Sequence, residues 1–476
     1  MSQPMTIAID PISRIEGHLK ASVMVEDGRV VDARLTGGMY RGFESILKGR
    51  DPRDAVQITQ RICGVCPVSH ALASSMALEK AAGTLPPRNG RLARNLMQGA
   101  NFLQSHILSF YHLAGQDFIE GPDSAPFRPR YARPDLRFDA RLNALGMDEY
   151  LEALEVRRTC HEMAALFGGR MPHVQGILAG GAAARPTKAQ IAGFRARCEG
   201  VRAFVEDKYL PMVYLAASRY RDLCGMGSGY AAALCMGGFP QDDGGQNFLF
   251  RPGVYCQGQD YPFDPLKVAE YVRYSWFADG AGGRLLSQGG GAVDMNKAGA
   301  YSFSKAPRYD GHPMEVGPHA RMWISHAELS PVGARLARKY FGMEAAGIRD
   351  LGERFVFSIM GRHLARAEEA FVVVKAIQRW LDELEPGGET WTSPRLPSSA
   401  EGFACTEAPR GSLLHALSIR DGAISQYQIL PATLWNCSPR DDMGQRGPVE
   451  QALIGVTVPD SESPVNVGRL IRAFDP

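Results

Sequence analysis

The sequence predicts an α+β protein, mainly helical, in which long helices form the core and small β elements lie near both ends of the chain. Three observations support this class. They are long segments with apolar residues at helical spacing, two segments that alternate apolar and polar residues, and glycine-rich stretches between them. No linker or internal repeat interrupts the chain, so we expect residues 1–476 to form a single domain.

The two alternating segments predict β-hairpins. Residues 18–36 alternate around an Asp-Gly pair at 27–28, and residues 413–430 alternate around an Asp-Gly pair at 421–422. An Asp-Gly pair favours the two-residue turns that join antiparallel strands, because both turn positions adopt a positive φ. We therefore expect one hairpin near each end of the chain.

The helical core is predicted by four segments in which apolar residues recur every three to four positions. These segments are residues 90–120, 145–168, 187–222 and 354–386. Glycine is instead frequent at residues 225–260 and 279–300, which indicates loops and short strands laid across the helices.

Composition is that of a soluble globular protein, with 45% hydrophobic and 22% charged residues. The 53 basic residues nearly balance the 51 acidic ones, and no long basic run occurs, so we expect no nucleic-acid partner. No apolar run reaches the roughly 18 residues of a membrane-spanning helix, and we predict no transmembrane segment. The first residues lack the basic start and apolar core of a secretory signal.

Nine cysteines are scattered along the chain, and this odd number argues against a disulfide framework. Only Cys63 and Cys66 stand at chelating spacing, and we expect the other seven to be small buried apolar residues. Two cysteines three positions apart can direct both sulfurs at one ion, with Gly64 allowing a tight bend. Thiolates select soft or borderline metals, which excludes calcium and magnesium here. His70, one helical turn after Cys66, can ligate the metal or hydrogen-bond a thiolate.

Three kinds of site are compatible with this pair: half of a zinc site, a thioredoxin-like redox pair, and a metal site completed by distant ligands. A zinc site needs a second chelating pair, and the sequence contains no other CxxC or CxxH. A redox pair needs a preceding strand in a compact α/β context, which the helical pattern around residue 63 does not offer. The third kind of site is favoured.

At this point the chain matches a known family. TQRICGVCPVSHALAS at 59–74 resembles the first metal-binding motif of nickel–iron hydrogenase large subunits, RxCGxCxxxH, with every fixed position present. The resemblance covers residues 6–476 and implies the hydrogenase large-subunit fold. Six further blocks resemble the family in the expected order: DPISRIEGH at 10–18, YRGFESILKGRDPRDA at 40–55, FYHL at 110–113, KAPRYDGHPMEVGP at 305–318, EAPRGSLLH at 407–415 and VGRLIRAFDP at 467–476.

The resemblance implies roles for the first motif. Cys63 would be a terminal nickel ligand, and Cys66 would bridge nickel and iron, with carbonyl and cyanide ligands completing the iron. His70 would hydrogen-bond the bridging sulfur; packing within its helix is the alternative. Glu16 resembles the family's proton gate, although it could instead pair with Arg14 or Arg41.

Two further sites are implied in the same way. Glu44 resembles the carboxylate ligand of a buried magnesium (or iron) site, together with the backbone carbonyl of Ile429; a solvated glutamate is the alternative. Arg410 resembles the guanidinium above the open metal position, with Pro409, Asp117 and Asp475 around it. For Asp117 a structural role competes strongly, because the segment FYHLAGQDF departs from the usual family spelling.

The implied function is the reversible heterolytic cleavage of dihydrogen into protons and electrons. The chain has no second cysteine cluster, so electrons would pass to a separate iron–sulfur small subunit and onward to a carrier such as a cytochrome. Through that subunit the protein would be periplasmic or membrane-associated, with the cytoplasm as the alternative. A hydrogen-sensing homologue remains open, as does a nickel-free core subunit of a respiratory complex, although the intact Cys63 and Cys66 argue against the latter.

The family's second motif reads DPCxxCxxH, and the sequence given stops at Asp475-Pro476. Two thiolates alone cannot hold the implied centre, so a chain that ended here would be inactive. In nickel–iron–selenium hydrogenases the next residue is selenocysteine, whose codon is ordinarily read as a stop. We therefore expect a selenocysteine at position 477; a deliberate truncation and an incomplete gene model are the alternatives.

The gene itself tests this expectation. We predict a UGA codon at position 477, followed in frame by residues that complete xxCxxH. A cysteine codon there would indicate a plain nickel–iron enzyme, and any other sense codon, or a UAA or UAG stop, would remove the selenium interpretation. Reading the next eight codons is sufficient.

Overall fold

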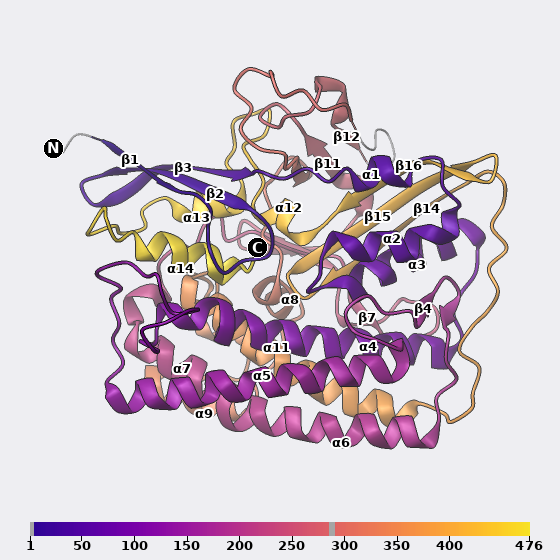
Figure 1. The fold of residues 1–476 in the computed structure, drawn as a ribbon, viewed down its shortest axis with the longest axis horizontal. Coiled ribbons are helices and arrows are strands. Elements are labelled where there is room, and N and C mark those ends of the chain that lie inside the picture. Colours follow the sequence, from indigo (N-terminus) through magenta and orange to yellow (C-terminus); the bar gives the residue numbers. More distant parts are fainter. Residues whose placement is uncertain (1–3, 285–290) are drawn as a thin grey trace.

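The long helices form one layer of the molecule. In the computed structural model, which describes residues 4–284 and 291–476, these helices lie side by side below the β elements (Figure 1). Their apolar faces join β2, β3 and the C-terminal helix in one large buried cluster. The layer contains α4 (Arg88–Ile107), α5 (Ala140–Gly168), α6 (Lys188–Phe204), α7 (Leu210–Arg219), α9 (Pro331–Phe341) and α11 (Ile359–Glu383).

This layer confirms the four predicted helical segments and the α+β class. The segment 90–120 is α4 continued by a π-helical stretch, Leu108–Ala114, and a short 3₁₀ turn, Gly115–Asp117. The segment 187–222 is similarly divided by a π-helical stretch at Val205–Tyr209. No helix in the described part of the chain is both long and apolar enough to cross a membrane. Whether residues 1–476 fold as one domain stays a prediction.

The N-terminal hairpin is confirmed within a three-stranded antiparallel sheet. Its strands are β1 (Met5–Ile9), β2 (Leu19–Glu26) and β3 (Arg29–Gly37). The turn residues Asp27 and Gly28 have φ values of 48° and 73°, as the two-residue turn requires.

The C-terminal hairpin is also confirmed, and it gains a strand that the sequence did not predict. The strands are β14 (Ala400–Ala408), β15 (Gly411–Arg420) and β16 (Ala423–Leu430), in that order in an antiparallel sheet. Only Pro409 and Arg410 connect β14 to β15, and Ala408 pairs with Gly411 across this turn. Arg410 is therefore the tip residue of a tight hairpin.

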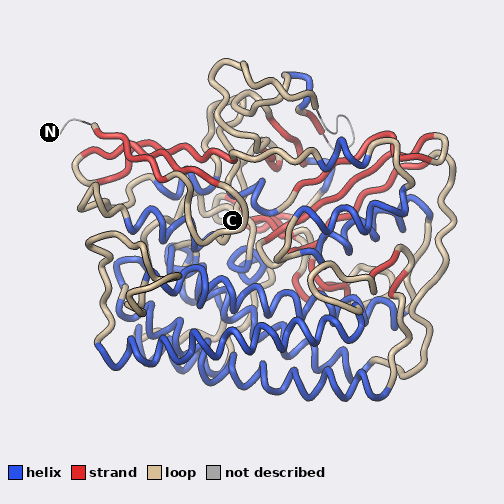
Figure 2. Tube along the Cα trace, in the orientation of Figure 1, coloured by secondary structure: helices blue, strands red, loops and turns tan. Residues whose placement is uncertain are grey.

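The glycine-rich segments are loops and short strands, as predicted, although residues 285–290 of the second segment lie outside the described residues. Figure 2 shows loops and strands (red) above the helical layer and further short strands at the level of the helices. The short strands in these segments are β6 (Ala233–Cys235), β7 (Gly238–Pro240), β8 (Phe248–Phe250), β9 (Gly253–Cys256), β10 (Gln259–Tyr261) and β12 (Gly283–Arg284). Four more short strands lie outside them: β4 (Ile177–Leu178), β5 (Gly181–Ala182), β11 (Val268–Tyr271) and β13 (Ala306–Tyr309).

Helix α3 (Pro67–Ala82) carries the cysteine motif at its N-terminus and packs on β14. A Cβ atom on Gly402 would lie 2.1 Å from the carbonyl oxygen of Ala77, so helix and strand approach as closely as their backbones allow. Near the other end of the contact Ala73 packs against Ala408 and Leu413. The first turn of α3 is thereby placed beside the hairpin tip that carries Arg410.

The C-terminal helix α14 (Val465–Phe474) ends inside the molecule, where Figure 1 marks the C end. Asp475 adopts a left-handed conformation with a φ of 58°, and the carbonyl oxygen of Pro476 accepts a hydrogen bond from the backbone N–H of Glu16 at 3.1 Å. The remaining helices are α1 (Phe43–Leu47), α2 (Ala55–Thr59), α8 (Pro318–Ile324), α10 (Glu353–Val356), α12 (Ala432–Asn436) and α13 (Pro448–Leu453).

Candidate metal centre

The two cysteine sulfurs converge on one buried point at the start of α3. Cys63 is extended and Cys66 immediately precedes Pro67, the first residue of the helix. The backbone N–H of Cys66 donates to the Sγ atom of Cys63 at 3.1 Å, and both side chains are buried. The chain bends at residues 64–66, between the two cysteines; Gly64 does so without a positive φ, and a Cβ there would lie 4.0 Å from Oε1 of Glu16.

The electrostatic environment makes one thiol of the pair the easier to ionise. The side-chain hydrogen bond from Cys66 lowers the pKa of Cys63 and outweighs burial, and Arg410 adds to this effect. The same hydrogen bond, followed by burial, raises the pKa of Cys66. Cys63 is therefore the thiol of the pair that ionises first.

Arg410 reaches this site from the hairpin tip. Its side chain is buried and Nη2 donates to Oδ1 of Asp475 at 3.2 Å. Burial alone would lower its pKa, but Asp475, then Cys63, Cys66 and Glu16, raise it. Nε and Nη1 of Arg410 and Oδ2 of Asp475 are buried without a hydrogen-bond partner in the described chain. Two unpaired donors of a buried cation thus lie in reach of the cysteines, where an anionic group would satisfy them.

Asp117 is held by arginines other than the one expected. Its Oδ1 accepts from Arg14 at 2.6 Å, and Arg472 donates to both of its oxygens at 2.6 and 2.8 Å. Although burial opposes ionisation, Arg14 and Arg472 lower the pKa of Asp117 to about 2. The carboxylate that pairs with Arg410 is Asp475, so Asp117 ties the N-terminal segment to α14.

His70 lies on the first turns of α3 and belongs to a buried polar chain. Its Nδ1 is 3.0 Å from Nε2 of His415, and Nδ1 of His415 is 3.0 Å from the hydroxyl of Tyr427. That hydroxyl bonds in turn to Ser74 at 3.0 Å. Burial and then the charge of Arg41 lower the pKa of His70 to about 3, so its ring is neutral.

Glu16 lies at the edge of the cysteine site, and its side chain is exposed in this chain. The two arginines proposed as alternative partners are engaged elsewhere. Arg14 binds Asp117 and the carbonyl oxygen of Leu113, and Arg41 binds the carbonyl oxygens of Arg61 and Ile62. Arg41 thereby anchors the two residues that lead into Cys63.

Glu44 and Ile429, which are 385 positions apart, are in contact, and the metal site expected from Glu44 and the Ile429 carbonyl stays a prediction. The backbone N–H of Ile429 donates to Oε1 of Glu44 at 2.9 Å. Three buried polar residues that the sequence did not predict lie on the same side: Gln428 donates to Glu270 at 2.7 Å, Lys305 is 3.5 Å from Glu270, and Glu44 helps to raise the pKa of Lys305.

Known proteins resemble this chain in sequence and in structure. The family described as nickel-dependent hydrogenase matches residues 41–123 and 116–476, and a family described as HoxL-like matches residues 6–36. The periplasmic [NiFeSe] hydrogenase large subunit of Desulfomicrobium baculatum is 54% identical over 99% of this chain and 93% of its own length.

The chain belongs to the nickel-dependent hydrogenase family.

Solved structures of other members extend the similarity. The Ni-Fe-Se hydrogenase of D. vulgaris Hildenborough in the reduced state has a TM-score of 0.98 and 60% identity, with 99% of this chain and 98% of that chain covered. The hydrogenase-1 large chain of Escherichia coli is 30% identical over 99% of this chain and 93% of its length. These similarities confirm the large-subunit fold and the hydrogenase activity expected from the sequence.

The residues of this hydrogenase large subunit fit part of a nickel–iron centre. Two buried sulfurs and the unpaired donors of Arg410 meet the needs of a soft metal with anionic ligands. Within residues 4–284 and 291–476 no group of three or more His, Cys, Asp or Glu side chains could hold a metal. Residues 63 and 66 therefore supply half of the four thiolates that the family motif implies.

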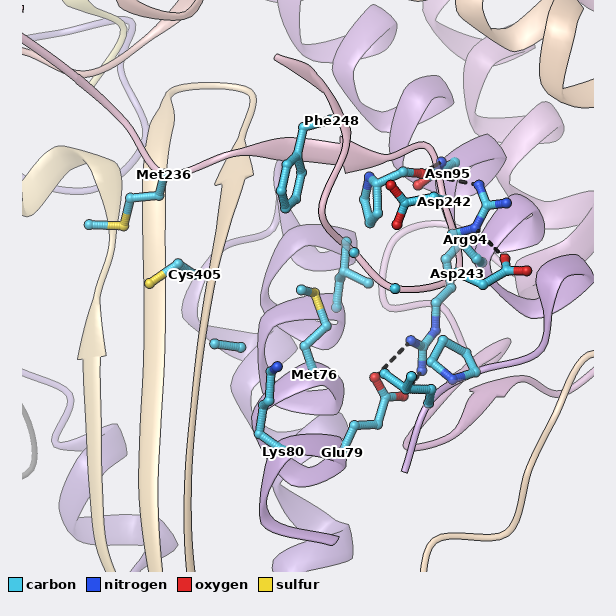
Figure 3. A pocket seen from close by; sticks show the side chains of 18 of the residues that line it. Met76, Glu79, Lys80, Arg94, Asn95, Met236, Asp242, Asp243, Phe248 and Cys405 are labelled. Carbon is cyan, nitrogen blue, oxygen red and sulfur yellow. Dashed lines mark hydrogen bonds and ion pairs between the residues drawn. The ribbon is translucent and has the colours of Figure 1, made fainter. Parts of the chain in front are cut away.

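A cavity of about 260 Å³ lies apart from the cysteine site, between α3, α4 and β14 (Figure 3). Its walls are mainly apolar, with Met76, Met236 and Cys405 among them, and the ion pair between Glu79 and Arg94 lies at one side. None of the predicted site residues lines it.

Sequence reasoning missed the arginines that hold the site. Arg14 and Arg472 stand inside matched blocks, RIEG and RLIRAFDP, and this position was the available signal. Arg321 lies on α8 and His415 on β15. No local sequence pattern indicates which residues they contact. Arg14 also has a φ of 60°, a conformation that non-glycine residues seldom adopt.

The carboxylate between two arginines gives a stability prediction. Asp117→Asn leaves Arg472 buried without its counter-charge, and we expect the free energy of unfolding to fall by about 3 kcal/mol. Because its pKa is depressed to about 2, the contribution of Asp117 is present at neutral pH and is lost as pH falls from about 4 through 2. Chemical denaturation of parent and variant at several pH values measures both effects.

The matched control is Asp222→Asn, which breaks a half-exposed pair with Arg137. We expect it to change the free energy of unfolding by less than about 1 kcal/mol. Equal losses in the two variants, or a loss from Asp117→Asn that persists at pH 2, would contradict the account.

Proposed function

We propose that this chain is the catalytic large subunit of a selenium-type nickel–iron hydrogenase that cleaves dihydrogen heterolytically and reversibly. The observation that carries this proposal is the buried Cys63/Cys66 pair facing a buried arginine with two unpaired donors. When bound, the nickel–iron centre supplies a soft Lewis acid that polarises dihydrogen.

The chain's own residues then have distinct tasks. Cys63 would be a ligand of the nickel alone, and Cys66 would be a ligand of both nickel and iron. Nε and Nη1 of Arg410, which are buried without a partner in the described chain, would donate hydrogen bonds to anionic ligands of the iron such as cyanide. Asp475 fixes the guanidinium by its 3.2 Å contact, and burial keeps water away from the reacting atoms. Pro409 shapes the turn that carries Arg410.

A proton leaves by Glu16. Its carboxylate stands at the edge of the site and contributes to the electrostatic field at both cysteines. A carboxylate in this position can take a proton from a sulfur and pass it to solvent or to the partner subunit. His70 holds the bridging sulfur in place, and its pairing with His415 fixes the orientation of its ring.

A second metal would be held beside the C-terminal sheet. Glu44 and the backbone carbonyl of Ile429 would offer oxygen ligands to magnesium or iron. The hydrogen bond of 2.9 Å from the backbone N–H of Ile429 to Oε1 of Glu44 supports this pairing. Glu270, Gln428 and Lys305 are near enough to bind the waters that such an ion retains.

The selenium assignment is supported by the relatives at 54% and 60% identity, which are nickel–iron–selenium enzymes by name. A selenocysteine at the next position would supply a softer nickel ligand than a thiolate, and its selenol would ionise well below the pKa of about 8.5 of an ordinary cysteine thiol. The name of the Desulfomicrobium relative also supports a periplasmic location. Electrons pass to an iron–sulfur small subunit and then to a carrier such as a cytochrome.

Proton exit by Glu16 is tested with Glu16→Gln in the complete heterodimer. Glutamine keeps the shape but cannot relay a proton, so hydrogen–deuterium exchange with solvent should fall on the order of a hundredfold while nickel and iron remain bound. Mass spectrometry of the evolved gas measures exchange, and elemental analysis measures the metals.

Glu389→Gln is the control, because this side chain is 78% exposed and pairs only loosely with Arg185. It should exchange at the parent rate. If Glu16→Gln also exchanges at that rate with both metals present, protons leave by another group.

A further inference from the structure

A second buried arginine lies directly behind the hairpin tip. Arg321 belongs to α8 and its side chain is 0% exposed. All five of its N–H groups have partners. Nε and Nη2 donate to the two oxygens of Glu369 at 2.8 and 2.7 Å, Nη1 donates to Glu407 at 2.7 Å and to the carbonyl oxygen of Ala408 at 2.8 Å, and Nη2 also donates to the carbonyl oxygen of Pro409 at 2.7 Å.

The two carbonyls belong to the residues immediately before Arg410. Since only Pro409 and Arg410 connect β14 to β15, fixing the Ala408 and Pro409 carbonyls fixes the path of the whole turn. The other side of the turn is equally confined. Gly411 has a φ of 138°, and a Cβ there would lie 2.5 Å from a methyl group of Val316.

The carboxylates that hold Arg321 are themselves fixed. Oε1 of Glu369 is 2.8 Å from Nε2 of His106. Oε1 of Glu407 accepts from the hydroxyl of Ser412 at 2.6 Å and from the backbone N–H of Met236 at 2.8 Å. A planar guanidinium can satisfy two carboxylates and two carbonyls at once, whereas the compact ammonium of lysine has only three donors.

We propose that Arg321 is a positioning residue for the hydrogenase reaction: by holding the Ala408 and Pro409 carbonyls it aims the unpaired donors of Arg410 at the cysteine site. The proposal rests on the role of Arg410 given above. Arg321 itself contacts no reacting group.

The chain contains a matched control for this role. Arg308 is also 0% exposed and also uses all five donors, on Asp441, Ser438 and the carbonyl oxygens of three neighbouring residues. It holds the segment around α12 and not the hairpin tip. Replacing either arginine by lysine therefore removes the same chemistry from a buried position, but only one replacement frees the turn.

The experiment compares Arg321→Lys, Arg308→Lys and Arg410→Lys in the complete heterodimer. Backbone amide exchange in the peptide 406–414 reports the turn, and kcat and KM for dihydrogen report the chemistry. In Arg321→Lys we expect exchange in this peptide to rise about tenfold and kcat to fall by about tenfold or more, with KM changed less than about twofold. Arg308→Lys should lower the melting temperature by a comparable amount, while amide exchange in the peptide 406–414 and kcat stay at their parent values.

Several results would overturn the proposal. Unchanged exchange at 406–414 in Arg321→Lys would show that the turn is held by other contacts, and a loosened turn with parent kcat would show that its position does not matter. If Arg321→Lys yields no heterodimer, Glu369→Gln, which weakens the grip on Arg321 without removing it, should loosen the turn and lower kcat in the same direction, and its failure to do so also overturns the proposal. Parent activity in Arg410→Lys instead removes the role assigned to Arg410.

Discussion

Ion pairs between buried arginines and carboxylates hold the cysteine site together from segments that are far apart in the sequence. Asp117, at the end of the α4 segment, binds Arg14 near the N-terminus and Arg472 in α14. Asp475 binds Arg410 at the tip of the β14–β15 hairpin. The backbone of Glu16 adds a hydrogen bond to Pro476. The point where Cys63 and Cys66 converge is thus enclosed by segments that charge pairs fix in relation to one another.

Buried ion pairs add little net free energy to folding, so their main contribution here is to the geometry of the site. Removing two charges from water costs several kcal/mol per ion, and the attraction between them returns that cost only when the geometry is good and the other polar atoms are satisfied. Apolar packing could supply comparable stability without a directional requirement. The arginine–carboxylate pairs instead specify distances and orientations. In Arg321 all three guanidinium nitrogens have partners, whereas in Arg410 two nitrogens, Nε and Nη1, have none in the described chain.

The sequence predicted those parts of the molecule that local patterns or matched blocks encode. Asp-Gly pairs identified both hairpin turns, and helical periodicity identified the long helices. The CxxC spacing identified the two cysteines that meet at the start of α3, and the structure has the expected contacts between Glu44 and Ile429 and between Arg410 and Asp475.

The remaining features depend on contacts that no local pattern contains. Strand β14 was missed because its identity as a strand comes from pairing with β15 and packing under α3. Asp117 was expected around Arg410, and the fold pairs it with Arg14 and Arg472. Arg321 is an ordinary helical arginine in the sequence, and only the fold places the Ala408 and Pro409 carbonyls within its reach.

The central claim is that Cys63 and Cys66 hold the metals of this hydrogenase, and metal content tests it most directly. Nickel and iron should be measured by elemental analysis in purified Cys63→Ser, Cys66→Ser and Cys256→Ser heterodimers. Cys256 is a half-buried cysteine in β9, away from the centre. Because a hydroxyl is a poor substitute for soft sulfur, nickel should be lost from the first two variants and retained at the parent level in the third. Stoichiometric nickel in Cys63→Ser or Cys66→Ser would contradict the assignment.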